Sequence, residues 1–123
     1  MKKFILFISI ALFTLVSIAQ DGAAITFEKT TIDYGKIAKN SDGIRTFKFT
    51  NTGTAPLKIT DVKATCGCTV PTYPKQDIMP GETGEIAIAY DTVKPGRFSK
   101  SIKVFTNTKE QKIVLRIKGN VLP

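Results

Sequence analysis

Apolar and polar residues alternate along most of the chain, in short runs separated by turn-forming residues. Alternation with a period of two is typical of strands that bury one face and expose the other. Two short strands are expected at 25–27 and 32–37, and no segment after residue 20 has a convincing helical period. The inward positions of the later runs are Phe47, Phe49, Leu57, Ile59, Ile86, Ile88, Tyr90, Phe98, Ile102, Val104, Ile113, Leu115, Ile117 and Val121. We therefore predict an all-β protein, an immunoglobulin-like antiparallel β-sandwich of about seven strands, with a small closed barrel as the alternative.

The alternation is interrupted at three places. Gly35 breaks the second strand and predicts a bulge there. Leu57 and Ile59 point one way, but Val62 and Ala64 have the opposite parity, and this change at about Asp61 indicates a bulge or a strand that switches sheets. Residues 66–80 contain three prolines, which are excluded from a central strand, so we expect mostly a long connection.

Residues 1–19 have the form of a signal peptide. Two lysines precede an apolar run over residues 4–18, and small residues near its end predict cleavage between Ala19 and Gln20. A membrane anchor is the alternative, but a helix of this length spans about 22 Å, less than the ~30 Å of a bilayer core. We therefore expect an exported protein, periplasmic or secreted, whose residues 20–123 form a single domain with no membrane span.

Composition narrows the functional classes. The full chain has a net charge of +8, and removing the two lysines of the signal peptide leaves +6. A positive exported protein tends to meet anionic polysaccharides, lipid head groups or envelope surfaces. The chain has no histidine, which excludes the Ser-His-Asp and Cys-His arrangements and the commonest zinc ligand. Nucleic acid is a poor fit because the chain lacks interleaved aromatics, and we expect neither a cofactor nor an enzymatic activity.

The only two cysteines, Cys66 and Cys68, stand one residue apart in a chain expected to reach an oxidising compartment. In an extended strand their Cα atoms would lie about 6.6–7 Å apart. A disulfide needs about 4.4–6.8 Å, so closure requires a bend, which Gly67 permits. A three-residue loop contributes only about 1.6 kcal/mol in the loop-entropy model, so such a bond adds little stability and is easily reduced. We predict that the two thiols are oxidised to each other.

The role of this pair stays open at the level of sequence. It is a local structural bridge, a redox-active pair, a bridge to another chain, or a soft-metal site for Cu(I), to which thiolates are suited. Met79 is a further soft ligand for the copper reading. Zinc is disfavoured because four ligands would need carboxylates as well.

Basic residues recur at outward positions of the predicted strands. They are Lys48, Lys58, Lys103, Arg116 and Lys118, with Phe105 on the parity of Lys103. If their strands are neighbours, these side chains form a basic face that binds an anionic glycan or the acidic surface of a partner. The alternative is that the lysines protect the sheet against edge pairing and aggregation.

Seven short motifs occur in an order that resembles one known family. They are NTG at 51–53, PLKI at 56–59, CGCT at 66–69, IMPGE at 78–82, YD at 90–91, GRF at 96–98 and VFTN at 104–107. The chain resembles the secreted bacterial family known as domain of unknown function 1573. The resemblance implies an immunoglobulin-like sandwich similar to the modules of major sperm protein and pilus chaperones. It also implies that the protein is exported, mainly in Gram-negative bacteria. It implies no known activity.

These observations favour an exported, non-enzymatic domain that is a binding or structural module of the bacterial envelope. Its partner would be an envelope protein or an anionic surface polymer. One possible mode of binding is addition of a partner strand to a free sheet edge. The alternative function is a thiol redox or copper-handling protein that uses Cys66 and Cys68.

Overall fold

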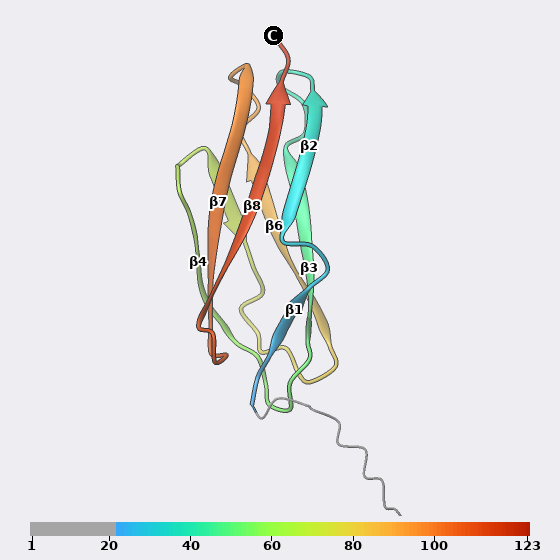
Figure 1. Cartoon of the computed structure of the whole chain (residues 1–123), viewed down its shortest axis with the longest axis vertical. Helices are drawn as coiled ribbons and strands as arrows, with labels where there is room; N and C mark the ends of the chain where they lie inside the picture. Colours follow the sequence, from blue (N-terminus) through green and yellow to red (C-terminus); the bar gives the residue numbers. More distant parts are fainter. Residues whose placement is uncertain (1–21) are drawn as a thin grey trace, which may run out of the picture.

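The computed structural model describes residues 22–123, which contain eight strands and no helix (Figure 1). The strands are β1 (Ile25–Phe27), β2 (Thr31–Ile37), β3 (Ile44–Asn51), β4 (Ile59–Ala64), β5 (Thr69–Thr72), β6 (Thr83–Tyr90), β7 (Gly96–Thr106) and β8 (Lys112–Val121). The signal peptide and the cleavage point between Ala19 and Gln20 fall outside the described residues and stay predictions. Within residues 22–123, no helix is long and apolar enough to cross a membrane.

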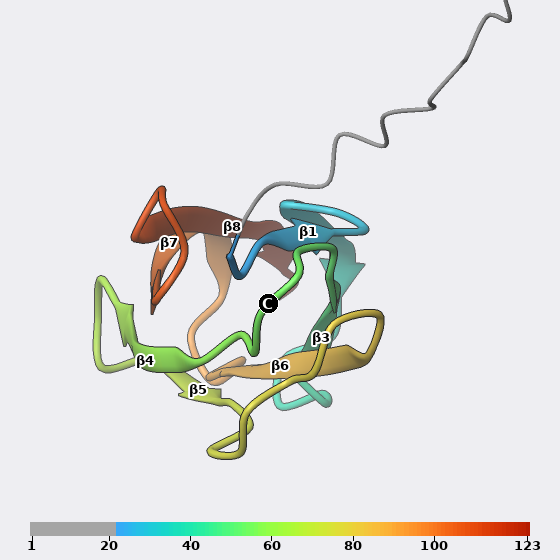
Figure 2. The same ribbon diagram turned by 90° about the horizontal axis from the view of Figure 1, so that it is seen from below.

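The strands form two four-stranded sheets that enclose one interior (Figures 1 and 2). Sheet A has the order β1-β3-β6-β5, and sheet B has the order β2-β8-β7-β4. The predicted immunoglobulin-like sandwich is thus confirmed, with eight strands instead of about seven. One pair departs from the antiparallel pattern, because β2 pairs in parallel with β8. The chain passes from sheet A to sheet B between β1 and β2 and keeps its direction, so β1 is antiparallel to β3 while β2 is parallel to β8.

The core lies between the sheets and is built from the inward parity of the central strands. Sheet A contributes two phenylalanines of β3 and two isoleucines of β6, and sheet B contributes the alternate aliphatic residues of β7 and β8. The fully buried members of this set are Phe47, Phe49, Ile86, Ile88, Ile102, Val104, Leu115 and Ile117. Burial of each such side chain stabilises the fold by about 1.5–3 kcal/mol, so the alternating pattern itself is what holds the two sheets together.

The bulge predicted at Gly35 is present, and the parity change at Asp61 is a register shift within β4 rather than a switch between sheets. The β2–β8 register shifts between Asp33 and Lys36, and Gly35 adopts a φ of 69°, a conformation that favours glycine. The β4–β7 register shifts between Ile59 and Asp61, where the inward parity changes along the sequence.

The connection from β4 of sheet B to β5 of sheet A carries both cysteines. Figure 2 shows β4 and β5 next to each other at the side where the two sheets meet. The prediction that residues 66–80 are mostly a connection is confirmed, although β5 occupies four of them. Pro71 is tolerated in β5 since this strand is the edge of sheet A and pairs only with β6.

One end of the core is aromatic. The rings of Tyr90 and Phe98 stack at 3.9 Å between centroids, and Tyr34 meets Phe98 edge-on at 5.3 Å. The Tyr34 hydroxyl donates a 2.7 Å hydrogen bond to the Gly43 carbonyl. Burial raises the pKa of Tyr34 to about 12, although the Arg45 guanidinium over its ring opposes the shift. This end therefore depends on a neutral, hydrogen-bonded tyrosine.

The opposite end of sheet A is tied together by one buried amide. Asn51 is fully buried, and its side-chain oxygen accepts hydrogen bonds from the backbone N–H groups of Ala24 and Gly53. Its side-chain nitrogen donates to the carbonyls of Ala55 and Ile78, each at 2.8 Å. Asn51 therefore joins the entry to β1, the turn after β3 and the segment before β6.

Candidate functional site

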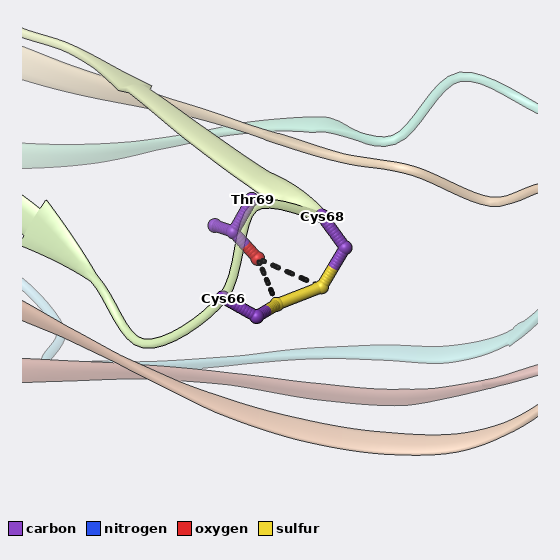
Figure 3. Close-up of a disulfide and its surroundings, with 3 residues drawn as sticks. All are labelled: Cys66, Cys68 and Thr69. Carbon is purple, nitrogen blue, oxygen red and sulfur yellow. Dashed lines mark hydrogen bonds between the residues drawn. A yellow bond between two sulfur atoms is a disulfide. The ribbon is translucent and has the colours of Figure 1, made fainter.

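The Cys66–Cys68 pair forms a disulfide on the crossover between β4 and β5 (Figure 3). The two Cα atoms lie 5.3 Å apart, within the range that disulfides occupy. The chain therefore bends between the cysteines, as the sequence argument required. Both cysteines are half-buried, so the bond lies at the surface of the sandwich rather than in its core.

The bend does not depend on the conformational freedom of glycine. Gly67 has no positive φ, and a Cβ built on it would meet no atom within 4 Å. Backbone hydrogen bonds hold the loop on both sides of Gly67. The Thr69 N–H donates to the Cys66 carbonyl at 3.3 Å, and the Asp91 N–H donates to the Cys68 carbonyl at 2.9 Å. These bonds keep the cysteines near each other independently of the sulfur–sulfur bond.

Thr69 is a neighbour of both sulfurs that its place in the sequence did not indicate. Its side chain is buried, and its hydroxyl oxygen lies 3.8 Å from the Sγ atoms of both Cys66 and Cys68, as the dashed lines in Figure 3 show. A threonine directly after the second cysteine, at the first position of an edge strand, is the signal that could have pointed to it. The hydroxyl is placed to donate a hydrogen bond to either sulfur.

Met79 lies too far from Cys66 and Cys68 to be a third ligand of a copper ion bound by their sulfurs. This methionine lies in the turn before β6, whereas the cysteines lie beside the last residue of β6. The eight residues of β6 separate the two places by about 25 Å. Among residues 22–123, no group of three His, Cys, Asp or Glu side chains is arranged to hold a metal ion.

Four of the six residues predicted to form an interaction face lie together on the outer face of sheet B. Lys103 and Phe105 project from β7, and Arg116 and Lys118 project from the neighbouring β8. Lys58 lies at the edge of the same sheet, where its backbone pairs with Asn107 beyond the end of β7. Lys48 does not belong to this face, because β3 is part of sheet A. Parity along a strand predicts that a side chain points outward, but it does not predict which sheet the strand joins.

The structure adds further cations to this face. These cations are Lys36, Lys63, Arg97 and Lys112, and all four side chains are exposed. The register of the strands of sheet B places them on the same side as Lys103 and Arg116. Asp33 and Asp61 are the acidic residues with the same orientation, so seven basic and two acidic side chains give the outer face of sheet B a net charge of +5. We call this surface the basic face.

The outer face of sheet A is nearly free of charge. Its charged residues are Lys48 and Glu85, which stand opposite each other across β3 and β6. The rest of this face consists of threonine, alanine, isoleucine and valine, and Ile44 and Val70 are more than half exposed. The positive charge of the sandwich is therefore concentrated on one of its two sheets.

Few interactions neutralise the basic face. The Lys63 ammonium lies 3.8 Å from the Asp61 carboxylate and 5.9 Å from the centre of the Phe105 ring. The Arg116 guanidinium donates to the Ser99 hydroxyl at 3.2 Å. At the β2 bulge the face contains an open hollow of about 540 Å³, whose lining includes Lys36, Arg97 and Lys118. Cationic groups thus remain available to an external anion.

The edge strand β5 does not suit strand addition. The bond from Asp91 to Cys68 fixes Val70 and Thr72 as the residues whose backbone groups pair with β6. Thr69 and Pro71 therefore direct their backbone groups to the free edge. The Thr69 N–H is already used by Cys66, and proline has no N–H, so this edge offers no free donor to an incoming strand.

Comparison with known proteins supports the fold and the family. A family described as "Protein of unknown function (DUF1573)" matches residues 25–121. None of the curated proteins matches the chain. Among solved structures, a protein of unknown function from Porphyromonas gingivalis W83 superposes with a TM-score of 0.72 at 17% identity, over 85% of this chain. The match covers 49% of that protein, so the chain spans about half of its length.

Two further solved structures have a similar fold. The ASH/PapD-like domain 7 of human CEP192 gives a TM-score of 0.68 at 9% identity, covering 93% of this chain and 97% of that domain. The CsuC–CsuE chaperone–tip adhesion subunit complex of Acinetobacter baumannii gives a TM-score of 0.60 at 13% identity. The match covers 80% of this chain and 57% of that chain. Proteases and a glycoside hydrolase also contain similar domains, so the fold alone does not separate binding modules from enzymes. Since the family match spans most of the sequence, this chain belongs to the DUF1573 family of proteins of unknown function.

Proposed function

We propose that this chain is an exported, non-enzymatic module that binds an anionic polymer of the bacterial envelope through the basic face of sheet B. The observation that carries the proposal is the difference between the two sheets. The outer face of sheet B has a net charge of +5, whereas that of sheet A has one lysine opposite one glutamate. A charge distribution of this kind attracts a polyanion to one side of the molecule.

Protection of sheet edges does not account for the cations on β7 and β8. The order of sheet B places β7 and β8 in its centre, between β2 and β4. Lys103 and Arg116 therefore project from strands whose edges are already paired. Lys63 stands directly opposite Lys103 across β4 and β7, an arrangement of like charges that destabilises a sheet. A bound polyanion offsets this repulsion, which gives a reason for the arrangement.

The surface also suits an extended ligand. Neighbouring strands are about 4.8 Å apart, and outward residues along one strand are about 6.6–6.8 Å apart. The cations thus form a flat array rather than a single deep pocket. Val114, which is 45% exposed, and the half-buried Phe105 give this array apolar contacts beside the charges. A linear polymer with repeated carboxylate or sulfate groups matches such an array better than a small ligand does.

The proposal is tested by binding of polygalacturonate at about 50 mM salt, where screening is weak. The face variant carries Lys63→Gln, Lys103→Gln and Arg116→Gln. A matched control removes the same charge elsewhere, with Lys29→Gln, Lys39→Gln and Lys48→Gln. Because each exposed charge pair contributes about 0.2–1 kcal/mol, we expect the face variant to bind about tenfold more weakly and the control to bind within about threefold of the unmodified protein.

Two results would contradict the proposal. One is equal weakening by the two variants, which would show that net charge rather than the basic face determines binding. The other is absence of measurable binding by the unmodified protein, which would favour an acidic envelope protein as the partner of this surface. Calorimetry on the mature chain, with circular dichroism to verify the fold of each variant, provides both readouts.

A further inference from the structure

The Cys66–Cys68 disulfide is not needed to hold the crossover in place. Strand β4 is anchored by its ladder to β7, and β5 is anchored by its ladder to β6. Between them, the Thr65 N–H donates to the Ser101 carbonyl at 3.2 Å, and both cysteine carbonyls accept the backbone hydrogen bonds described above. The bond itself closes a ring of only three residues. Opening it therefore leaves every strand pairing intact.

The same backbone keeps the two cysteines within bonding reach in either state. Their Cα atoms are 5.3 Å apart because the turn from Cys66 to Thr69 is closed by its own hydrogen bond. Both residues are half-buried rather than enclosed in the core, and Gly67 between them has no side chain. An incoming thiolate can thus reach the sulfur pair, and the reduced pair can close again without rearrangement of the fold.

Thr69 supplies the polar contact that the chemistry needs. Its hydroxyl oxygen is 3.8 Å from each sulfur, and its side chain is 3% exposed, so neighbouring atoms fix its position (Figure 3). A hydroxyl that donates to sulfur stabilises the thiolate over the thiol. The rate of thiol–disulfide exchange rises as the leaving sulfur becomes a better leaving group. Thr69 is positioned to assist whichever cysteine leaves.

We propose that Cys66 and Cys68 form a thiol–disulfide exchange site that oxidises exposed dithiols of polypeptides. A substrate thiolate attacks one sulfur, the Cys66–Cys68 bond breaks, and its electron pair leaves on the other cysteine, which accepts a hydrogen bond from Thr69. The second substrate thiolate then attacks the substrate sulfur of the mixed disulfide and displaces the remaining cysteine. The substrate loses two electrons and gains a disulfide, the cysteines become a dithiol, and the two substrate protons pass to them through solvent.

This inference goes beyond the binding function and uses different residues, so each can fail without the other. The test mixes the oxidised, full mature chain with an unstructured synthetic peptide that contains two cysteines, and follows alkylation-quenched samples by intact mass. We expect stoichiometric formation of the peptide disulfide and of the reduced Cys66–Cys68 pair. The single variants Cys66→Ser and Cys68→Ser, mixed with the peptide disulfide, are expected to accumulate a mixed disulfide.

The role of Thr69 is measured with two variants. Thr69→Val removes the hydroxyl and is expected to slow exchange about fivefold, since hydrogen bonds to charged groups are among the stronger ones. Thr69→Ser retains the hydroxyl and is expected to stay within about twofold of the unmodified protein. Circular dichroism and urea unfolding verify the fold of both, and Thr69→Ala replaces Thr69→Val if the latter does not fold. The inference is overturned if the disulfide survives excess peptide dithiol unchanged, or if loss of the hydroxyl leaves the exchange rate unaltered.

Discussion

At the scale of single residues, the buried amide of Asn51 is the polar group on which the fold depends most. Its side chain makes four hydrogen bonds to backbone groups of three segments. We predict that Asn51→Ala lowers the free energy of unfolding by about 2–4 kcal/mol, because it leaves several backbone groups unpaired in a buried site. Urea unfolding at neutral pH measures this change.

Asn107 offers the matched control. Its amide also accepts from one backbone N–H and donates to one backbone carbonyl, at Lys58 and Pro56, but it is exposed. Water can replace these bonds, so Asn107→Ala is expected to cost less than about 1 kcal/mol. Equal losses in the two variants would contradict the role assigned to burial.

Tyr34 is expected to make the free energy of unfolding decrease at alkaline pH. Its pKa rises from the usual 10.0 to about 12 on folding, so the neutral form is favoured in the native state. The resulting stabilisation is complete below pH 10 and is lost as the pH rises toward about 12. We expect the unfolding free energy to fall over this range. Tyr34→Phe should be less stable at pH 8 and should lose much of this slope, whereas a slope identical to that of the unmodified protein would argue against Tyr34 as its source.

Core residues could be predicted from sequence because parity alone identifies them. Phe47, Ile88 and Leu115 are buried as the alternation requires. Asn51 and Thr69 could not be identified in this way, since a polar residue at a strand end has the same sequence signature whether it caps a turn or lies in a buried network. Their roles depend on segments far away in the sequence.

At the scale of strands, β8 requires a glycine where it crosses the aromatic end of the core. A Cβ on Gly119 would lie 2.7 Å from the Tyr34 Cβ and 2.9 Å from the Phe98 ring. We therefore predict that Gly119→Ala destabilises the protein by about 1–3 kcal/mol through displacement of these side chains. Thermal unfolding followed by circular dichroism measures it. Gly67→Ala, which adds the same methyl group in open space, should unfold within about 0.5 kcal/mol of the unmodified protein.

The edge strand β5 is protected by its proline. Pro71 directs its backbone toward the free edge and has no N–H, so replacement by valine creates a free donor there. We predict that Pro71→Val self-associates at lower protein concentration than the unmodified chain, as measured by size-exclusion chromatography with light scattering. Thr72→Val increases apolar surface on the same strand without adding an edge donor. Equal association of this control and Pro71→Val would show that the missing N–H of the proline does not protect the edge.

Sequence patterns predicted most strands but not how they are distributed between the sheets. Strand β5 was missed because its proline argued against a strand, and the edge position that makes a proline acceptable is visible only in three dimensions. Lys48 was grouped with Lys103 because both point outward, although they lie on different sheets. The parallel pairing of β2 with β8 joins segments that are far apart in the sequence, so no local sequence pattern predicts it.

At the scale of the whole molecule, the sandwich has two chemically different outer surfaces. One is a strongly basic sheet whose central strands carry most of the cations, and the other is a largely uncharged sheet. The fold is shared with proteins of varied function, so it does not by itself select a partner. The proposed function therefore rests on this difference between the surfaces, and a decisive experiment must distinguish them.

Titration of a ¹⁵N-labelled chain of residues 20–123 with polygalacturonate, followed by two-dimensional NMR, tests this directly. We expect the largest shifts at the outward residues of sheet B, including Lys103, Arg116 and Lys118, and little change at Ile44 and Val70 on sheet A. Shifts concentrated on sheet A, or spread evenly over both sheets, would contradict the assignment of the basic face as the binding surface.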